Sequence, residues 1–557
     1  MTKCSVVGMQ FRITIDRVCV AILSFLTAGC IAPAVAAAAA EPAFGINLAG
    51  PVDWNSELPF VDVFRMSRPW ISQREGAGWG KGPELDLDKR GYVRRLKPGC
   101  FAESIVCTID GNHYPSGNYT MFFEGTGEIE PAGAATRVVS TKSKDGVTRM
   151  TFDVDASRGA IFLRLRKTAP KDPVRNIRVI MPGFEDTYEA EPFHPKFLER
   201  WRGVACIRFM DWMHTNGSSI RNVADRPRMN DATWSARGIP LEVMIDLCNR
   251  LACDAWFCVP HMADDDYVRK FASVVKKRLD RKRRVYVELS NEVWNGGFQQ
   301  QHYAQAQAKR LGIGSPEHGW EASGKWYARR CVEIFAIFND VFGEKKGQKD
   351  GRLVRVIAGQ ASNSWWSEHV ILPAEVPGGR ASDFADVLAI APYVGLVPTP
   401  NGKPSSDDVA GWSVDQVMDH VENVALKEAI RAMNDQARIA KAHGLALVAY
   451  EAGQHLVGAG GGENNDKLTE LLQRANRDPR MGKVYDAYFK AWEDADGELL
   501  CHFSSVGTWS KWGSWGLLQY ADDDPKASPK YQAVRRWRSG LARTRHQNQR
   551  RRSDPSP

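Results

Sequence analysis

The segment Val285-Tyr286-Val287-Glu288-Leu289-Ser290-Asn291-Glu292-Val293-Trp294-Asn295 joins an apolar, β-branched run to a polar Asn-Glu pair. The first half has the length and composition of a strand buried in a parallel sheet. The polar pair follows where such a strand ends, and in a (β/α)₈ barrel the loops after the strands carry the active site. The segment therefore predicts a barrel strand that delivers catalytic groups at its carboxyl end.

A second apolar run ends in the same way. Leu445 to Ala449 leads through Tyr450 into the carboxylate of Glu451. If both runs are strands of one barrel, their carboxyl ends meet at the same end of the barrel. The sequence thus predicts two glutamates, Glu292 and Glu451, in one site.

Further strands are expected before, between and after these two. The apolar runs lie at residues 44–48, 204–209, 255–260, 353–358, 387–393 and 499–506, and helical patterns lie at 266–279, 324–342 and 425–443. Strands that alternate with helices are typical of a parallel sheet. We therefore predict an α/β fold, a (β/α)₈ TIM barrel formed by residues 41–84 and 184–540.

The distance between the first two predicted strands is too long for one βα unit. From residue 85 to 183 the sequence changes to short alternating runs, such as Tyr119 to Phe123 and Arg149 to Val154, separated by turn signals such as Asp145-Gly146. This pattern predicts a small antiparallel β-sandwich inserted between barrel strands 1 and 2. Two roles are open for it, glycan binding or a structural wall beside the cleft.

Both ends of the chain differ from its body. Residues 1–40 contain Lys3, Arg12 and Arg17, an apolar run and small-residue cleavage sites, which predicts a signal peptide and a secreted or periplasmic protein. Cys30 leaves a lipoprotein anchor as the alternative. Residues 541–557 are Arg-rich and almost free of apolar residues, which predicts a basic disordered tail. The two ends carry most of the net charge of +8, and the nearly neutral body gives no indication of nucleic-acid binding. No other apolar run is long enough to span a membrane.

Eight of the eleven cysteines lie after residue 40. Cys100 and Cys107 are close in sequence, so a local disulfide is expected in an exported protein. The later group lacks the paired spacing and histidine partners of a zinc site, so we expect buried thiols or one disulfide among its members, which are Cys206, Cys248, Cys253 and Cys258.

The two strand-end motifs resemble those of the retaining glycoside hydrolases with a (β/α)₈ barrel, the clan of the family 5 cellulases and mannanases. Those enzymes carry Asn-Glu after strand 4 and a lone Glu after strand 7, which match Asn291-Glu292 and Glu451. The resemblance implies that Glu292 is the acid/base and Glu451 the nucleophile of a double displacement. It also implies that Asn291 binds the sugar 2-hydroxyl.

Other site residues follow from the same resemblance or from the predicted loops. The resemblance implies that Arg208 keeps the nucleophile charged, that Tyr393 donates to it and that Trp509 forms a platform for sugar. Relatives often carry His two residues before that Tyr, where this chain has Ala391. Glu288 is expected to form a buried ion pair, for which Arg208 is a possible partner. Aromatic and imidazole rings predicted at the catalytic end add substrate-binding candidates, namely Trp212, Trp294 and His261.

The leading hypothesis is an exported, monomeric, retaining β-glycoside hydrolase that acts on a poly- or oligosaccharide without metal or organic cofactor. A transglycosylase with the same site is an alternative, because a sugar can replace water as the acceptor. A non-catalytic carbohydrate-binding or scaffold protein is another. A metal-dependent barrel hydrolase is the third, for which His261 and the run Asp264 to Asp266 are the suggestive cluster.

Overall fold

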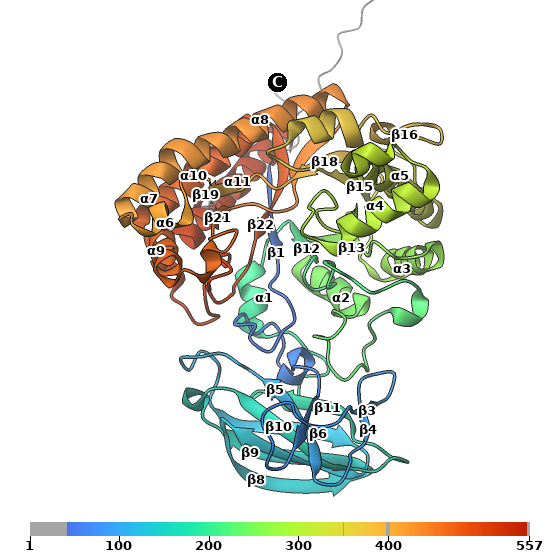
Figure 1. Ribbon diagram of the computed structural model, residues 1–557, viewed down its shortest axis with the longest axis vertical. Helices are drawn as coiled ribbons and strands as arrows, with labels where there is room; N and C mark the ends of the chain where they lie inside the picture. Colours follow the sequence, from blue (N-terminus) through green and yellow to red (C-terminus); the bar gives the residue numbers. More distant parts are fainter. Residues whose placement is uncertain (1–41, 349, 397–401, 554–557) are drawn as a thin grey trace, which may run out of the picture. The chain divides into compact units, whose positions relative to one another are not determined.

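The computed structural model describes residues 42–348, 350–396 and 402–553. In this part of the chain eight parallel strands close into a barrel in their sequence order (Figure 1). They are β1 (Ala43–Asn47), β12 (Cys206–Arg208), β13 (Asp254–Val259), β14 (Val285–Leu289), β15 (Leu353–Ala358), β18 (Val387–Ile390), β20 (Ala446–Ala449) and β22 (Gly497–Phe503). The predicted barrel is confirmed, and each predicted strand overlaps an observed one.

Helices surround this barrel in Figure 1. They are α1 (Pro195–Trp201), α2 (Leu241–Leu251), α3 (Asp265–Arg278), α4 (Gln299–Leu311), α5 (Gly319–Phe342), α6 (Ser406–Ala410), α7 (Val414–His420), α8 (Leu426–Ala442), α9 (Asp466–Arg477), α10 (Pro479–Asp494) and α11 (Pro529–Ser553). α8 shows why they pack: its buried residues Leu426, Ala429, Met433 and Ala440 recur at helical spacing and form one apolar face.

Two antiparallel four-stranded sheets lie between β1 and β12 in the sequence, in the orders β2-β5-β10-β7 and β11-β6-β9-β8. Their strands are β2 (Ile71–Arg74), β5 (Cys100–Val106), β6 (Gly117–Glu124), β7 (Gly127–Gly133), β8 (Ala135–Lys144), β9 (Val147–Val154), β10 (Ile161–Thr168) and β11 (Arg175–Ile180). Alternate residues of β10 are buried, as expected for a sheet with one face on a core. The predicted antiparallel insertion is confirmed, although its first strand begins before residue 85.

Short strand pairs complete the described sheets. β19 (Val394–Leu396) and β21 (Gln454–Leu456) form a parallel pair that extends the chain beyond barrel strands β18 and β20. The remaining pairs are antiparallel, β3 (Asp86–Leu87) with β4 (Val93–Arg95) and β16 (Glu375–Val376) with β17 (Gly379–Arg380).

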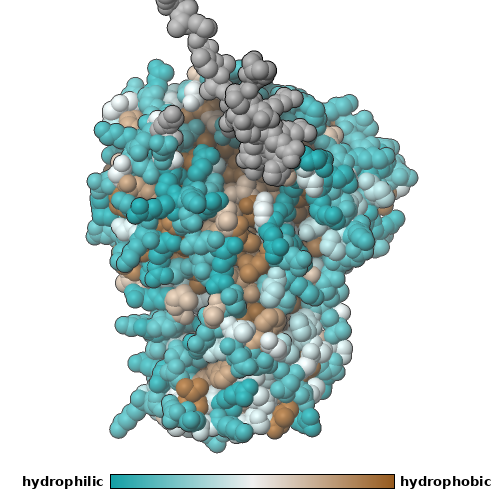
Figure 2. All heavy atoms as spheres, turned by 180° about the vertical axis from the view of Figure 1, so that it is seen from behind, coloured by the Kyte–Doolittle hydropathy of each residue, from teal (hydrophilic) through white to brown (hydrophobic). Residues whose placement is uncertain are grey.

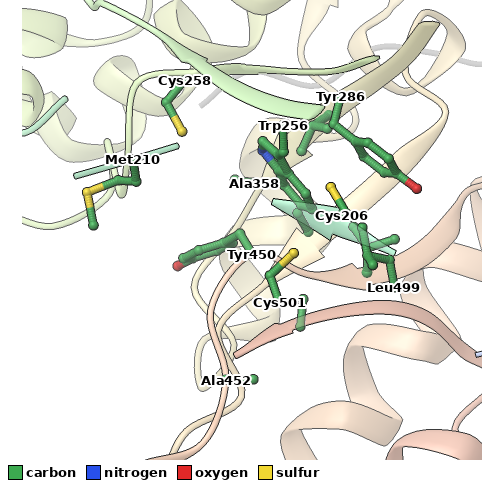
Figure 3. Packing of buried hydrophobic residues seen from close by; sticks show 14 of the residues in the cluster. Cys206, Met210, Trp256, Cys258, Tyr286, Ala358, Tyr450, Ala452, Leu499 and Cys501 are labelled. Carbon is green, nitrogen blue, oxygen red and sulfur yellow. The ribbon is translucent and has the colours of Figure 1, made fainter. Parts of the chain in front are cut away.

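Large side chains fill the barrel interior (Figure 3). The rings of Trp256 and Tyr286 stack with centroids 5.0 Å apart. The thiols of Cys206 and Cys501 lie within hydrogen-bonding distance of each other, and the residue between them in the sheet is Gly45. A Cβ atom at Gly45 would come within 2.5 Å of the Cys501 sulfur, so a side chain at this position would displace the thiol.

The cysteines after residue 40 are all free thiols. The predicted disulfide between Cys100 and Cys107 is wrong, because Cys100 begins β5 and Cys107 follows its last residue. Seven extended residues span roughly 23 Å, far beyond the Cα separation of about 7 Å that a disulfide permits. In the later group, the alternative of buried thiols is the one observed.

The basic C-terminal tail is helical as far as Ser553, because α11 continues past residue 541. The prediction of disorder is therefore wrong up to that residue: Arg, Gln, Leu and Ala favour helix, and the helix extends from its packed first turns.

The predicted signal peptide and Cys30 lie outside the described residues. None of the described helices is long and apolar enough to cross a membrane. Figure 2 shows a mainly hydrophilic face, with hydrophobic residues gathered along its middle.

Candidate active site

The backbone turns sharply at the Asn-Glu pair after β14. Ser290 and Glu292 have φ values of 59° and 41°, in the left-handed region that residues other than glycine rarely adopt. Such conformations cost free energy and cluster at functional sites. They place Asn291 and Glu292 at the carboxyl end of the barrel.

Glu292 is held by neutral groups. Its carboxyl oxygens accept hydrogen bonds from the Tyr450 hydroxyl at 3.3 Å and from the Asn295 amide at 2.9 Å. Burial, together with the negative charge of Glu451, raises the pKa of Glu292 to about 7. The side chain is therefore able to hold a proton near neutral pH, as a general acid must.

Glu451 has charged and stronger donors. One carboxyl oxygen accepts from Arg208 Nη1 at 2.9 Å, and the other accepts from the Tyr393 hydroxyl at 2.9 Å. Burial raises the pKa of Glu451, while the charge of Arg208 and the Tyr393 hydrogen bond lower it. Of the two glutamates, Glu451 is thus the one whose ionised form has a cation beside it.

Arg208 connects the barrel core to this site. Its guanidinium makes two hydrogen bonds to Glu288, at 2.9 and 3.1 Å, and both side chains are fully buried. Glu288 also accepts from the Trp256 indole at 2.7 Å. The other hydrogen bonds of Arg208 go to Glu451 and to the amide oxygens of Asn47 and Asn291. Arg208 is therefore both the ion-pair partner of Glu288 and the cation beside Glu451.

The orientation of Asn291 is fixed from both sides. Its amide oxygen accepts from Arg208 at 2.8 Å, and its amide nitrogen donates to Asn216 at 3.1 Å. Gln300 donates to the same Asn216 oxygen and to the backbone oxygen of Asn291. This network leaves one amide N–H of Asn291 to donate to a ligand.

A cavity of about 400 Å³ opens beside Glu292. It is bounded by the loops after β14, β15, β18 and β20 and by one face of α8, which presents small alanines there. Its polar and aromatic lining residues are Glu292, Trp294, Asn295, Gln360, Ser362, Tyr393, Glu428 and His455. The cavity is large enough for sugar rings, and it touches Glu292 and the Tyr393 partner of Glu451.

The predicted tryptophans divide between cleft and core. Trp294 lines the cavity, as expected. Trp212 is only 1% exposed and packs its ring against Phe60 and Phe209, so the structure places it in the core, without a free face for sugar.

Trp509 also lies away from the cleft, contrary to expectation. Its ring lies against the cations Arg477 and Lys530, with centroid distances of 4.6 and 4.5 Å. A different tryptophan of the same loop, Trp515, contacts Tyr393 and His455 at centroid distances of 5.7 and 4.8 Å. Trp515 is therefore the tryptophan of this loop that lies beside the Tyr393 partner of Glu451.

His261 is 4% exposed and meets the ring of Tyr303 edge to face. Burial and the nearby charge of Arg221 lower its pKa to about 4.

The metal hypothesis for this region is not supported, because Asp264 caps α3 through the Tyr267 N–H and Asp265 pairs with Arg330. In the described ranges one triad has possible metal-ligand spacing, and it lies elsewhere, at His113, Asp522 and Asp523.

Three residues beside the two glutamates were not among the sequence candidates. Asn295 and Tyr450 donate to Glu292, and Asp211 lies near Glu451. The available signal was position: Tyr450 directly precedes Glu451, Asn295 ends the opening motif, and Asp211 follows Arg208 by three residues. Their residue types alone do not distinguish them from other polar loop residues.

No model of a known protein family matches this chain, and no curated protein does. Solved structures do resemble it. One is a 4-O-α-L-rhamnosyl-β-D-glucuronidase from Fusarium oxysporum 12S, with 12% identity and a TM-score of 0.34 over 60% of this chain and 62% of that one. A family 5 xyloglucanase from Paenibacillus pabuli matches with 10% identity and a TM-score of 0.34, over 64% of this chain and 93% of that one.

A GH5-4 broad specificity endoglucanase from Clostridium acetobutylicum matches with 10% identity and a TM-score of 0.31, over 60% of this chain and 88% of that one. The match to the Fusarium enzyme spans less than two thirds of that enzyme's length. At identities of 10% to 12%, these likenesses concern the fold and not the roles of individual residues.

Proposed function

We propose that this chain is an exported, retaining β-glycoside hydrolase that cleaves a poly- or oligosaccharide by double displacement. Glu292 is the acid/base and Glu451 the nucleophile. Export rests on the composition of residues 1–40 alone.

One observation carries the proposal: two neighbouring carboxyl groups have opposite surroundings. Glu292 has only neutral donors and a pKa raised to about 7 by burial and by the charge of Glu451. Glu451 is paired with a buried guanidinium. Retaining hydrolysis needs one protonated and one ionised carboxyl group, and two titratable groups with such different environments supply them.

In the first step, Glu451 attacks the anomeric carbon and Glu292 gives its proton to the glycosidic oxygen. The bond to the leaving group breaks, and the sugar is held as an ester of Glu451. As Glu451 loses its negative charge, its hydrogen bonds with Arg208 and with the Tyr393 hydroxyl weaken. The free N–H of Asn291 donates to the 2-hydroxyl of the sugar, a hydrogen bond that strengthens in the transition state.

The second step follows from the coupling between the two carboxyl groups. Once Glu451 is an ester, its negative charge no longer raises the pKa of Glu292, the second cause of that raised value after burial. Glu292 is then a carboxylate with a lower proton affinity, suited to accept a proton from water as the base. Water attacks the anomeric carbon, and Glu451 leaves as a carboxylate.

The direct test is a screen of the purified chain against β-glucans, mannans, xylans and bacterial exopolysaccharides, with released reducing ends as the measurement. We expect one class to be cut by the wild type and not by Glu292→Ala. A wild type that cuts nothing but is retarded by one glycan in an affinity gel would replace the proposal with the carbohydrate-binding alternative. Longer products than substrate would identify a transglycosylase.

The pH dependence of kcat/KM provides a second test. Activity requires Glu292 protonated and Glu451 ionised, so the profile is bell-shaped. As the pH rises through about 7, Glu292 loses its proton and activity falls. With a 2,4-dinitrophenyl substrate, whose leaving group needs no proton, Glu292→Gln will keep the acid limb and lose the alkaline one. If the alkaline limb persists in this variant, a group other than Glu292 causes it.

A further inference from the structure

Asp211 is a third carboxyl group at the nucleophile. It lies on the loop that follows β12, three residues after Arg208, and its backbone oxygen accepts from the His214 N–H at 3.0 Å. On the other side it approaches the loop after β1, where a Cβ atom at Gly50 would lie 3.6 Å from the Asp211 Cβ. The side chain is half-buried, and no described residue donates a hydrogen bond to its carboxyl group.

The position of Asp211 relative to the two glutamates distinguishes two sides of the site. The charges that act on its carboxyl group are those of Glu451 and Arg208. The acid Glu292 borders the cavity of about 400 Å³, and because an acid protonates the leaving oxygen, the leaving group belongs on that side. Asp211 does not line this cavity, and the charges that act on it are those of the nucleophile and its cation, so it belongs beside the ring that becomes attached to Glu451.

We propose that Asp211 binds hydroxyl groups of the sugar ring that reacts with Glu451, and that it selects this ring among related sugars. The inference rests on the proposed function and names a specificity residue within it. A carboxyl group presents two oxygens, which match two adjacent ring hydroxyls.

The surroundings of Asp211 support this role. The carboxyl group of Asp211 is half-buried and has no hydrogen-bond donor among the described residues, so a bound sugar can supply one without displacing a protein partner. Burial, with the charge of Glu451, raises the pKa of Asp211 to about 7. Sugar hydroxyls can both donate and accept, so they satisfy this group in either protonation state, which a fixed cation does not.

The test compares kcat and KM for Asp211→Ala and Asp211→Asn on β-1,4-glucan, β-1,4-mannan and β-1,4-xylan. These polymers share a linkage and differ at C2 or in the hydroxymethyl group. For the best wild-type substrate we expect kcat/KM to fall about 10- to 100-fold in Asp211→Ala, the range for a lost hydrogen bond to a charged group. The ratio of kcat/KM for this substrate to kcat/KM for each of the other two polymers will also fall. Asp211→Asn keeps the shape and part of the hydrogen bonding, so it will lose less.

Asp264→Asn is the matched control, an equivalent substitution on the loop after the next strand, where asparagine can still cap α3. It should keep the wild-type preference. Unchanged preference and kcat/KM in both Asp211 variants would overturn the inference while leaving the hydrolase standing. If the wild type cuts none of the three polymers and nothing in the wider screen, the proposed function fails and the inference falls with it. The melting temperature of each variant shows whether a loss of activity comes from a lost contact or from unfolding. If Asp211→Ala does not fold, the result for Asp211→Asn decides the test.

Discussion

Glu451→Ala is expected to lower the hydrolysis of the identified glycan by about 10⁴-fold or more, the scale seen when a covalent nucleophile is removed. The fold should survive, because the alanine leaves a small space beside Tyr393 and Arg208, and Arg208 keeps its two hydrogen bonds to Glu288. Initial rates of reducing-end release, with circular dichroism as a check on folding, measure both effects.

Azide makes this prediction specific. In Glu451→Ala the ion can occupy the space left by the carboxylate and attack an activated aryl glycoside directly, so the product will be the glycosyl azide of inverted configuration. In Glu292→Ala the nucleophile is intact, and azide will give the azide of retained configuration instead. Rescue of Glu292→Ala with inversion would exchange the assigned roles. Products of the same configuration from both variants would contradict both roles.

The barrel was predictable because its strands are continuous apolar runs that end in polar residues. Leu353–Ala358 has the observed bounds of β15, and Leu445 to Ala449 differs from β20 by one residue. The failures lie where a pattern is too weak to fix a conformation. The Arg-rich composition of the tail predicts disorder, but a helix already packed at Pro529 propagates through residues of good helix propensity. The spacing of Cys100 and Cys107 says nothing of the extended strand that separates them.

The site was predictable where position on a strand decides it and unpredictable where loop packing does. Glu292, Glu451 and Arg208 follow or end strands, and the barrel brings them together. Trp509 and Trp515 lie in one loop, and only the folded loop shows that Arg477 and Lys530 cover the first while the second faces Tyr393. The residue type alone does not show which tryptophans will lie in the core and which will line the cleft.

Arg208→Met will have the second large effect, on stability and activity together. Arg208 is fully buried between Glu288 and Glu451, so its loss leaves buried carboxylates without their cation. Removing one partner of a buried pair costs about 3–5 kcal/mol, measurable as a fall in the free energy of unfolding by urea. Activity will fall about 100-fold or more at neutral pH. The acid limb of the pH profile will move to higher pH, because Arg208 lowers the pKa of Glu451.

Arg355→Met is the control for stability alone. Arg355 is also a buried barrel arginine, paired with Asp386 at 2.8 Å and hydrogen-bonded to Asn339, away from the glutamates. It should lose stability and keep the wild-type pH profile. Adding Glu288→Gln to Arg208→Met removes one of the two orphaned charges, so it will recover part of the stability, and the two substitutions will not be additive. It will not recover activity, because Glu451 still lacks its cation. A double variant that regains activity along with stability would show that Arg208 serves the fold and not the nucleophile.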